Sequence, residues 1–231
     1  MSRKSFVWIA FAVAALQACS GLQGALSAQR ADNTQPPRIV VPVARASRVV
    51  IDGTFSPGEW DGAFRQPLGD NFEVYLLADS ENLYVGFKFL KDVEASFLSE
   101  VYVATSDRQF VNLHSSGALG EGVNDFPLQG GRTRFSVVTP PGGNRATGWE
   151  SNATPRETRV QGKEFKINRA KLPGATVRLA AVMMVVNSAM RETGNFPKDH
   201  GFSSADGWAE LVLPAKSARP DADGLERRGR A

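Results

Sequence analysis

Cysteine and histidine are nearly absent from this chain, which has one cysteine, Cys19, and two histidines, His114 and His200. A single cysteine excludes an intramolecular disulfide, and so few thiols and imidazoles argue against a zinc site. The sequence also lacks Cys-x-x-Cys-His, the attachment motif of covalent haem. No disulfide within the chain can therefore stabilise its fold.

Familiar catalytic motifs are missing as well. There is no Gly-x-Ser-x-Gly, no His-Glu-x-x-His and no phosphate-binding glycine loop. Glycosidase chemistry needs two carboxylates about 5–10 Å apart, and Glu59, Glu100, Glu150 and Glu164 are the available candidates. No motif pairs them, so the sequence predicts that the protein is not an enzyme.

A strong excess of one charge is absent from the middle of the chain. Residues 45–214 contain 18 Lys and Arg and 20 Asp and Glu, although the whole chain has a net charge of +3. Nucleic-acid binding needs a basic face on the folded domain. We therefore expect no nucleic-acid partner.

The first residues are typical of a bacterial secretion signal. Arg3 and Lys4 precede an apolar run, Phe6 to Leu16, of eleven residues. A transmembrane helix needs about 20 apolar residues, so this run is too short to span a bilayer. Leu16-Gln17-Ala18-Cys19 resembles the site at which bacterial lipoproteins are cleaved and lipidated on cysteine. We predict a signal peptide over 1–18 and a lipid anchor on Cys19. Simple secretion, with cleavage after Ala18 or Ala28, is the alternative.

The anchor predicts a place in the cell envelope. Ser20 follows the cysteine and lacks the acidic character that favours inner-membrane retention, so an outer-membrane lipoprotein is expected. A secreted or periplasmic protein is the alternative. Residues 19–44 are small, polar and proline-containing, which is typical of a flexible tether. Residues 215–231 show no apolar periodicity, and we predict a disordered tail.

Between these ends, apolar residues alternate with polar ones, as in β-strands. Phe72, Val74 and Leu76 form one such run, and Leu83 to Phe89 forms another after a four-residue turn. Val177 to Val186 is apolar on both faces, as a covered central strand would be. No stretch of twelve or more residues shows helical spacing. The sequence predicts one all-β domain over 45–214, folded as an antiparallel β-sandwich.

Several short motifs occur in a characteristic order along this domain. Ile51-Asp52-Gly53 is followed by Glu59-Trp60, and Asp79-Ser80-Glu81-Asn82 runs into Leu83-Tyr84-Val85. Gly148-Trp149-Glu150 and Glu164-Phe165-Lys166-Ile167 come later. Together they resemble family 9 carbohydrate-binding modules and their DOMON-like relatives. The resemblance implies a sandwich that binds polysaccharide or oligosaccharide without catalysis. Any hydrolysis would then belong to a separate glycoside hydrolase that the module assists.

Sugar binding needs flat aromatic faces for the C–H side of the ring, and charged or amide groups for its hydroxyls. Trp149 is the first candidate platform, with Tyr84 and Tyr102 beside apolar strand positions. Ordinary packing in the core or at an edge is the alternative for these three rings. The candidate hydroxyl partners lie near strand ends, where polar side chains also satisfy loop backbone; they are Arg108, Asn112 and Asn187.

No cofactor is assigned from the sequence, but two remain open. Relatives contain a structural calcium, yet Asp52, Asp70 and Asp92 are scattered and follow no calcium-loop spacing. Some DOMON-like domains bind haem b, for which Met183, Met184 or Met190 with either histidine would be the axial pair. Three functions follow: a glycan-binding module, a haem-binding electron carrier, or a structural lipoprotein that contacts another envelope protein.

Overall fold

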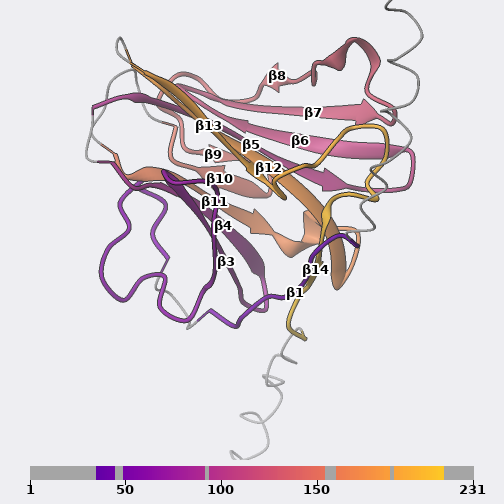
Figure 1. Ribbon diagram of the computed structural model, residues 1–231, viewed down its shortest axis with the longest axis horizontal. Helices are drawn as coiled ribbons and strands as arrows, with labels where there is room; N and C mark the ends of the chain where they lie inside the picture. Colours follow the sequence, from indigo (N-terminus) through magenta and orange to yellow (C-terminus); the bar gives the residue numbers. More distant parts are fainter. Residues whose placement is uncertain (1–34, 45–48, 92–93, 154–159, 188–189, 216–231) are drawn as a thin grey trace, which may run out of the picture. The chain divides into compact units, whose positions relative to one another are not determined.

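Two β-sheets face each other in the computed structural model, which describes residues 35–44, 49–91, 94–153, 160–187 and 190–215. From Pro36 onward these residues belong to one compact unit (Figure 1). Eight of the described strands form the larger sheet and six form the smaller. Helical structure in the described ranges is limited to two 3-10 turns, Gln129–Gly131 and Arg169–Lys171. The predicted antiparallel β-sandwich is confirmed.

The larger sheet has the strand order β1-β14-β12-β5-β6-β7-β8, and β13 also pairs with β12. All of these pairs are antiparallel except β1 with β14, which is parallel. The long strand β12 contacts β5, β13 and β14, which confirms its predicted central position. The strands are β1 (Arg38–Val40), β5 (Ser96–Ala104), β6 (Gln109–Ser115), β7 (Leu119–Asp125), β8 (Ser136–Val137), β12 (Thr176–Val186), β13 (Arg191–Phe196) and β14 (Ala209–Val212).

The smaller sheet is antiparallel throughout, with the order β2-β3-β4-β11-β10-β9. Its hairpin β3–β4 turns at Asp79, whose side chain accepts hydrogen bonds from the backbone of Glu81 and Asn82. Such a turn is expected of an Asp before a tight reversal. The strands are β2 (Phe64–Pro67), β3 (Phe72–Ala78), β4 (Asn82–Phe89), β9 (Arg145–Ala146), β10 (Trp149–Ser151) and β11 (Gly162–Asn168).

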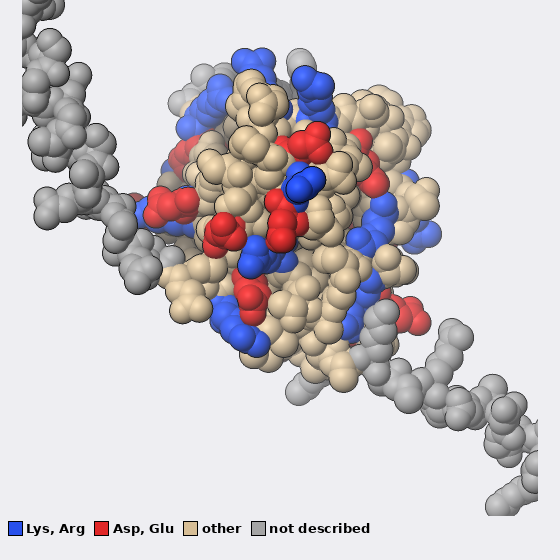
Figure 2. All heavy atoms as spheres, turned by 90° about the vertical axis from the view of Figure 1, so that its right-hand side faces the viewer, with Lys and Arg blue, Asp and Glu red and all other residues tan. Residues whose placement is uncertain are grey.

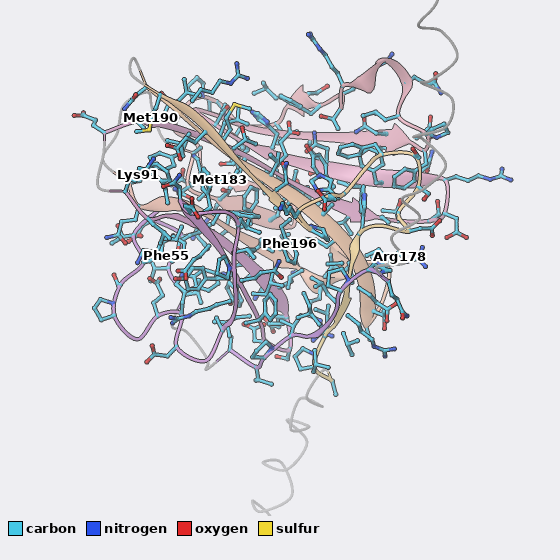
Figure 3. All side chains as sticks on the ribbon, in the orientation of Figure 1. Phe55, Lys91, Arg178, Met183, Met190 and Phe196 are labelled. Carbon is cyan, nitrogen blue, oxygen red and sulfur yellow. The ribbon has the colours of Figure 1, made fainter. Side chains whose placement is uncertain are left out.

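The main core lies between the two sheets. Because side chains alternate across a strand, every second residue of β3, β5 and β12 points into this space. Val74, Val101 and Leu179 are examples, and each is fully buried. Met183 and Phe196, labelled in Figure 3, belong to the same core. Each large apolar side chain buried in this way stabilises the fold by about 1.5–3 kcal/mol.

Each outer face carries a further apolar cluster beneath a loop. On the larger sheet, Tyr102 and Phe110 pack under Phe202 and Trp208. On the smaller sheet, Trp60, Tyr75 and Tyr84 pack with Phe55, which is labelled in Figure 3. The loops therefore leave only part of each outer face available for other contacts.

Exposed charges of both signs are mixed on the face of the molecule that Figure 2 shows. Figure 2 shows Lys and Arg interspersed with Asp and Glu, without a continuous area of one sign. Arg178 pairs with Asp206 and Arg38 with Glu210, at 3.2 and 3.3 Å. Exposed pairs of this kind contribute about 1 kcal/mol or less to stability.

The folded unit starts before the boundary predicted at residue 45. β1 pairs with β14, and the backbone of Ala44 and Ala78 is hydrogen-bonded, so part of the expected tether belongs to the sandwich. The predicted signal peptide, Cys19 and the predicted tail from 216 onward lie outside the described residues. Within the described ranges, no helix has the length and apolar character needed to cross a bilayer.

Candidate binding site on the outer face of the larger sheet

Polar side chains gather on the outer face of the larger sheet, beside the Tyr102 cluster. Strands β5 and β6 pair so that Glu100 faces His114 and Tyr102 faces Asn112. Their neighbours Val101 and Leu113 point into the core, so the alternation turns all four polar residues outward. The register thus brings together two residues predicted as ligand contacts, Tyr102 and Asn112, with two that were not.

Glu100 is the centre of this polar group. Its carboxylate accepts hydrogen bonds from the Tyr102 hydroxyl, from His114 Nδ1 at 3.0 Å and from Thr133 Oγ1 at 3.3 Å. Burial alone would raise the pKa of Glu100, but the hydrogen bonds from His114 and Tyr102 outweigh it and lower the pKa below its usual value. Burial, together with the charge of Glu100, raises the pKa of Tyr102. The site therefore holds a fixed negative charge and a neutral phenol.

Asn112 is the residue of this group whose hydrogen bonding is incomplete. It is fully buried, and neither Oδ1 nor Nδ2 has a hydrogen-bond partner among the described residues. The amide adjoins Glu100 and helps to lower the pKa of that carboxylate, but the two side chains do not reach good hydrogen-bond geometry. A buried polar group without a partner costs about 1–3 kcal/mol. Asn112 Oδ1 is therefore an unused acceptor, and Nδ2 is a donor that Glu100 engages only weakly.

A short stretch, Thr133–Phe135, lies over this group and is called the covering segment below. The Phe135 ring stacks on His114, with ring centres 4.0 Å apart and planes inclined by 14°. Gly120 and Gly122 make this approach possible, because a Cβ at either position would overlap Phe135 or the Arg134 backbone. The segment thus sits directly on β7.

Asn124 fixes the same segment from the end of β7. Its Oδ1 accepts a hydrogen bond from Arg134 N at 2.7 Å, and its Nδ2 donates to Arg134 O at 3.1 Å. The side-chain amide therefore replaces a strand partner for Arg134. Phe135 remains 38% exposed, so the cover is thin and open to solvent on its outer side.

Two predicted hydroxyl partners lie away from this group. Arg108 is exposed in the β5–β6 turn, where its backbone accepts a hydrogen bond from Phe126. Asn187 follows β12 and closes a turn, since it accepts from Met190 N at 2.9 Å and donates to Glu94 O at 3.3 Å. Asn187 matches the backbone-satisfying alternative stated for it, whereas the bonds of Arg108 involve its backbone alone.

Trp149 and Tyr84 belong to the opposite sheet. Trp149 is only 4% exposed; its ring packs nearly parallel to Phe165, and its Nε1 donates to Glu121 at 2.8 Å. Tyr84 is buried in the outer cluster, and its hydroxyl donates to Asp79 at 2.7 Å. Stacking on a sugar needs an exposed ring face, and neither ring provides one in this structure. The packing alternative describes both residues better, and it also describes the ring of Tyr102, which is 4% exposed and packs against Phe202 and Trp208.

The first of the motifs that resemble the family, Ile51-Asp52-Gly53 with Glu59-Trp60, has a structural role. Glu164 accepts hydrogen bonds from the backbone of Asp52 and Gly53, at 3.2 and 2.7 Å, and from Trp60 Nε1 at 3.0 Å. Gly53 has φ of +84°, and a Cβ there would lie 2.5 Å from Asn152 Nδ2. Ile51-Asp52-Gly53 and Trp60 thus close the outer cluster of the smaller sheet around Glu164.

The described residues considered for calcium form no metal-binding group, and Asp92, which was also considered, lies outside the described ranges. The described ranges contain no group of three or more His, Cys, Asp or Glu arranged to hold a metal. Both ring nitrogens of His114 are hydrogen-bonded, to Glu100 and Ser116, and Phe135 covers its face. Met183 is buried between the sheets. His114 and Met183 are therefore unsuited as an axial haem ligand pair, and calcium stays the alternative that the sequence left open.

Comparison with known proteins finds no matching family model and no matching curated protein. Among solved structures, a family 9 carbohydrate-binding module from Caldicellulosiruptor kristjanssonii in complex with cellotriose has a TM-score of 0.45 and 13% identity, covering 80% of this chain and 96% of that one. A Bacteroides uniformis protein provisionally described as carbohydrate-binding has a TM-score of 0.45 and 11% identity, covering 77% and 99%. No functional conclusion follows from similarity at this level.

Proposed function

We propose that the protein is an exported, lipid-anchored module that binds glycan without catalysis, through the outer face of the larger sheet. The observation that supports this function best is the buried, unpaired amide of Asn112 beside Glu100 and His114. A primary amide can accept from one sugar hydroxyl and donate to its neighbour, and a carboxylate accepts from hydroxyls. The pair therefore suits vicinal hydroxyl groups.

Access for a sugar requires the covering segment to move. Thr133 and Phe135 occupy the space above Glu100 and His114 in the free protein. Their removal would uncover the imidazole face and release one acceptor position on Glu100. A sugar ring could then place its C–H side on aromatic surface and its hydroxyls on Asn112 and Glu100.

A binding role also suits the chemistry of Glu100. General acid catalysis needs a carboxyl group that holds its proton near neutral pH. The lowered pKa of Glu100 keeps it ionised instead, and its hydrogen-bond partners among the described residues include no second carboxylate. Glu100 is therefore suited to hold hydroxyl groups and unsuited to protonate a leaving group.

Calorimetric titration with oligosaccharides tests the proposal. Cellotriose, the ligand named for the first structural neighbour, and hits from a glycan array are the first probes. Replacing Asn112 by Ala should weaken binding at least about tenfold, which corresponds to about 1.4 kcal/mol. Asn195→Ala, at an exposed position of β13, is the matched control and should bind as the wild type does. Folded protein that binds no glycan, or binding unchanged in Asn112→Ala, would refute the assignment.

A further inference from the structure

A second polar feature lies on the opposite side of the sandwich, on the outer face of the smaller sheet. It is a groove of about 370 Å³ between the start of β4, the β9–β10 hairpin and the end of β11. This volume falls within the roughly 300–1,000 Å³ typical of small-molecule sites. The residues used below are among its lining, which comprises Glu81, Asn82, Arg145, Ala146, Gly148, Trp149, Glu150, Lys166 and Asn168.

The strand register builds a charged triad into this groove. Glu150 pairs with Arg145 across β9–β10 and with Lys166 across β10–β11, so all three side chains project from the same face. Arg145 Nε lies 3.0 Å from one carboxylate oxygen of Glu150, and Lys166 Nζ lies 2.9 Å from the other. Two cations thus share one anion, and the triad carries a net charge of +1.

Donor capacity remains on both cations. Arg145 uses only Nε toward the described residues, so its two Nη groups retain their hydrogen-bond donors. Lys166 is 36% exposed and Arg145 85% exposed, whereas Glu150 is 18% exposed. The positive groups are therefore more accessible than the carboxylate that orients them. An incoming carboxylate would meet donors that Glu150 already holds in place.

The remainder of the groove offers partners for hydroxyl groups. Asn168 uses its Oδ1 to accept from Ala170 N, which leaves its amide donors for other contacts. Asn82 and Glu81 line the groove as well, and a carboxylate such as that of Glu81 accepts from hydroxyls. Trp149 reaches the lining although it is nearly buried, so little flat apolar surface is offered.

We propose that this groove binds an acidic sugar residue, with its carboxylate held by Arg145 and Lys166 and its hydroxyls held by the Asn and Glu side chains. Uronic acids of a polysaccharide have this combination of groups. The inference is independent of the site at Asn112, because the two sites are built from different sheets. Since the carboxylate contacts are exposed ion pairs, binding should weaken as salt is added.

Titration of the full-length protein with trigalacturonate tests this inference. It is carried out at about 20 mM and at about 500 mM salt, because charges are screened over a much shorter distance at the higher concentration. The double variant Arg145→Gln, Lys166→Gln should bind at least about tenfold more weakly at low salt. Arg178→Gln, which also removes an exposed ion-paired cation but lies in β12, should bind as the wild type does.

The variants distinguish binding in this groove from binding at the Asn112 site. Trigalacturonate binding that survives Asn112→Ala and is lost in the Arg145, Lys166 variant supports the groove, whatever happens with neutral glycans. The inference fails when trigalacturonate does not bind the wild type, or when the double variant binds it equally well. It fails also when Arg178→Gln loses as much affinity, because total charge would then explain the effect.

Discussion

At the scale of single residues, two buried ionisable groups follow each other in β11 and face opposite sides of the smaller sheet. Lys163 points into the core, where it donates to the backbone oxygens of Ser116 and Asn152, and burial lowers its pKa to about 7. Glu164 points outward, and burial raises its pKa to about 8 despite three N–H donors. Both groups are therefore sensitive to pH in the folded state.

These two shifts predict opposite pH dependences of stability. Between pH 4.5 and 8 the folded chain holds more of the Glu164 proton than the unfolded chain, so the free energy of unfolding falls as pH rises. Between pH 7 and 10.5 the folded chain holds less of the Lys163 proton, so the free energy of unfolding rises with pH. Urea denaturation across this range should show a flatter acid side in Glu164→Gln and a flatter alkaline side in Lys163→Met. Unchanged slopes would contradict the prediction.

At the scale of elements, the covering segment depends on two glycines of β7. In Gly122→Ala the new Cβ would meet the Arg134 carbonyl, so the segment should detach locally at a cost of about 1–3 kcal/mol. Amide hydrogen exchange of residues 133–137 should become correspondingly faster. Gly174→Ala is the matched control, since a Cβ there meets nothing within 4 Å. Equal exchange in the two variants would show that β7 does not hold the segment.

Sequence patterns predicted some strands of the sandwich but not β7. Alternating apolar residues predicted β3 and β4, and a run that is apolar on both faces predicted β12. β7 contains Gly120 and Gly122 on its outer face, so its pattern carried no strand signal, and its partner β8 is only Ser136–Val137. Alternation could have shown that Glu100 shares a face with Tyr102, and His114 with Asn112. Only the register of β5 and β6 shows that all four meet.

At the scale of the whole molecule, lipidation of Cys19 would hold the sandwich close to a membrane. The prediction rests on Leu16-Gln17-Ala18-Cys19 after an apolar run. In the native host the wild type should incorporate labelled palmitate and sediment with membranes, and Cys19→Ser should do neither. A mature chain that begins after Ala28 would instead indicate simple secretion. Anchoring would raise the local concentration of both proposed glycan sites at the cell surface.

The parallel pair β1–β14 has a practical consequence for handling this protein. Arg38–Val40 occupies the rim of the larger sheet, and Ile39 and Val41 are buried beside it. A recombinant fragment that started at residue 45 would leave the backbone groups of β14 that face β1 unpaired, and it would uncover apolar side chains at the same place. An exposed sheet edge of this kind can pair with strands of other chains, which leads to aggregation. Material for crystallisation or titration should therefore retain the chain from Pro36 onward.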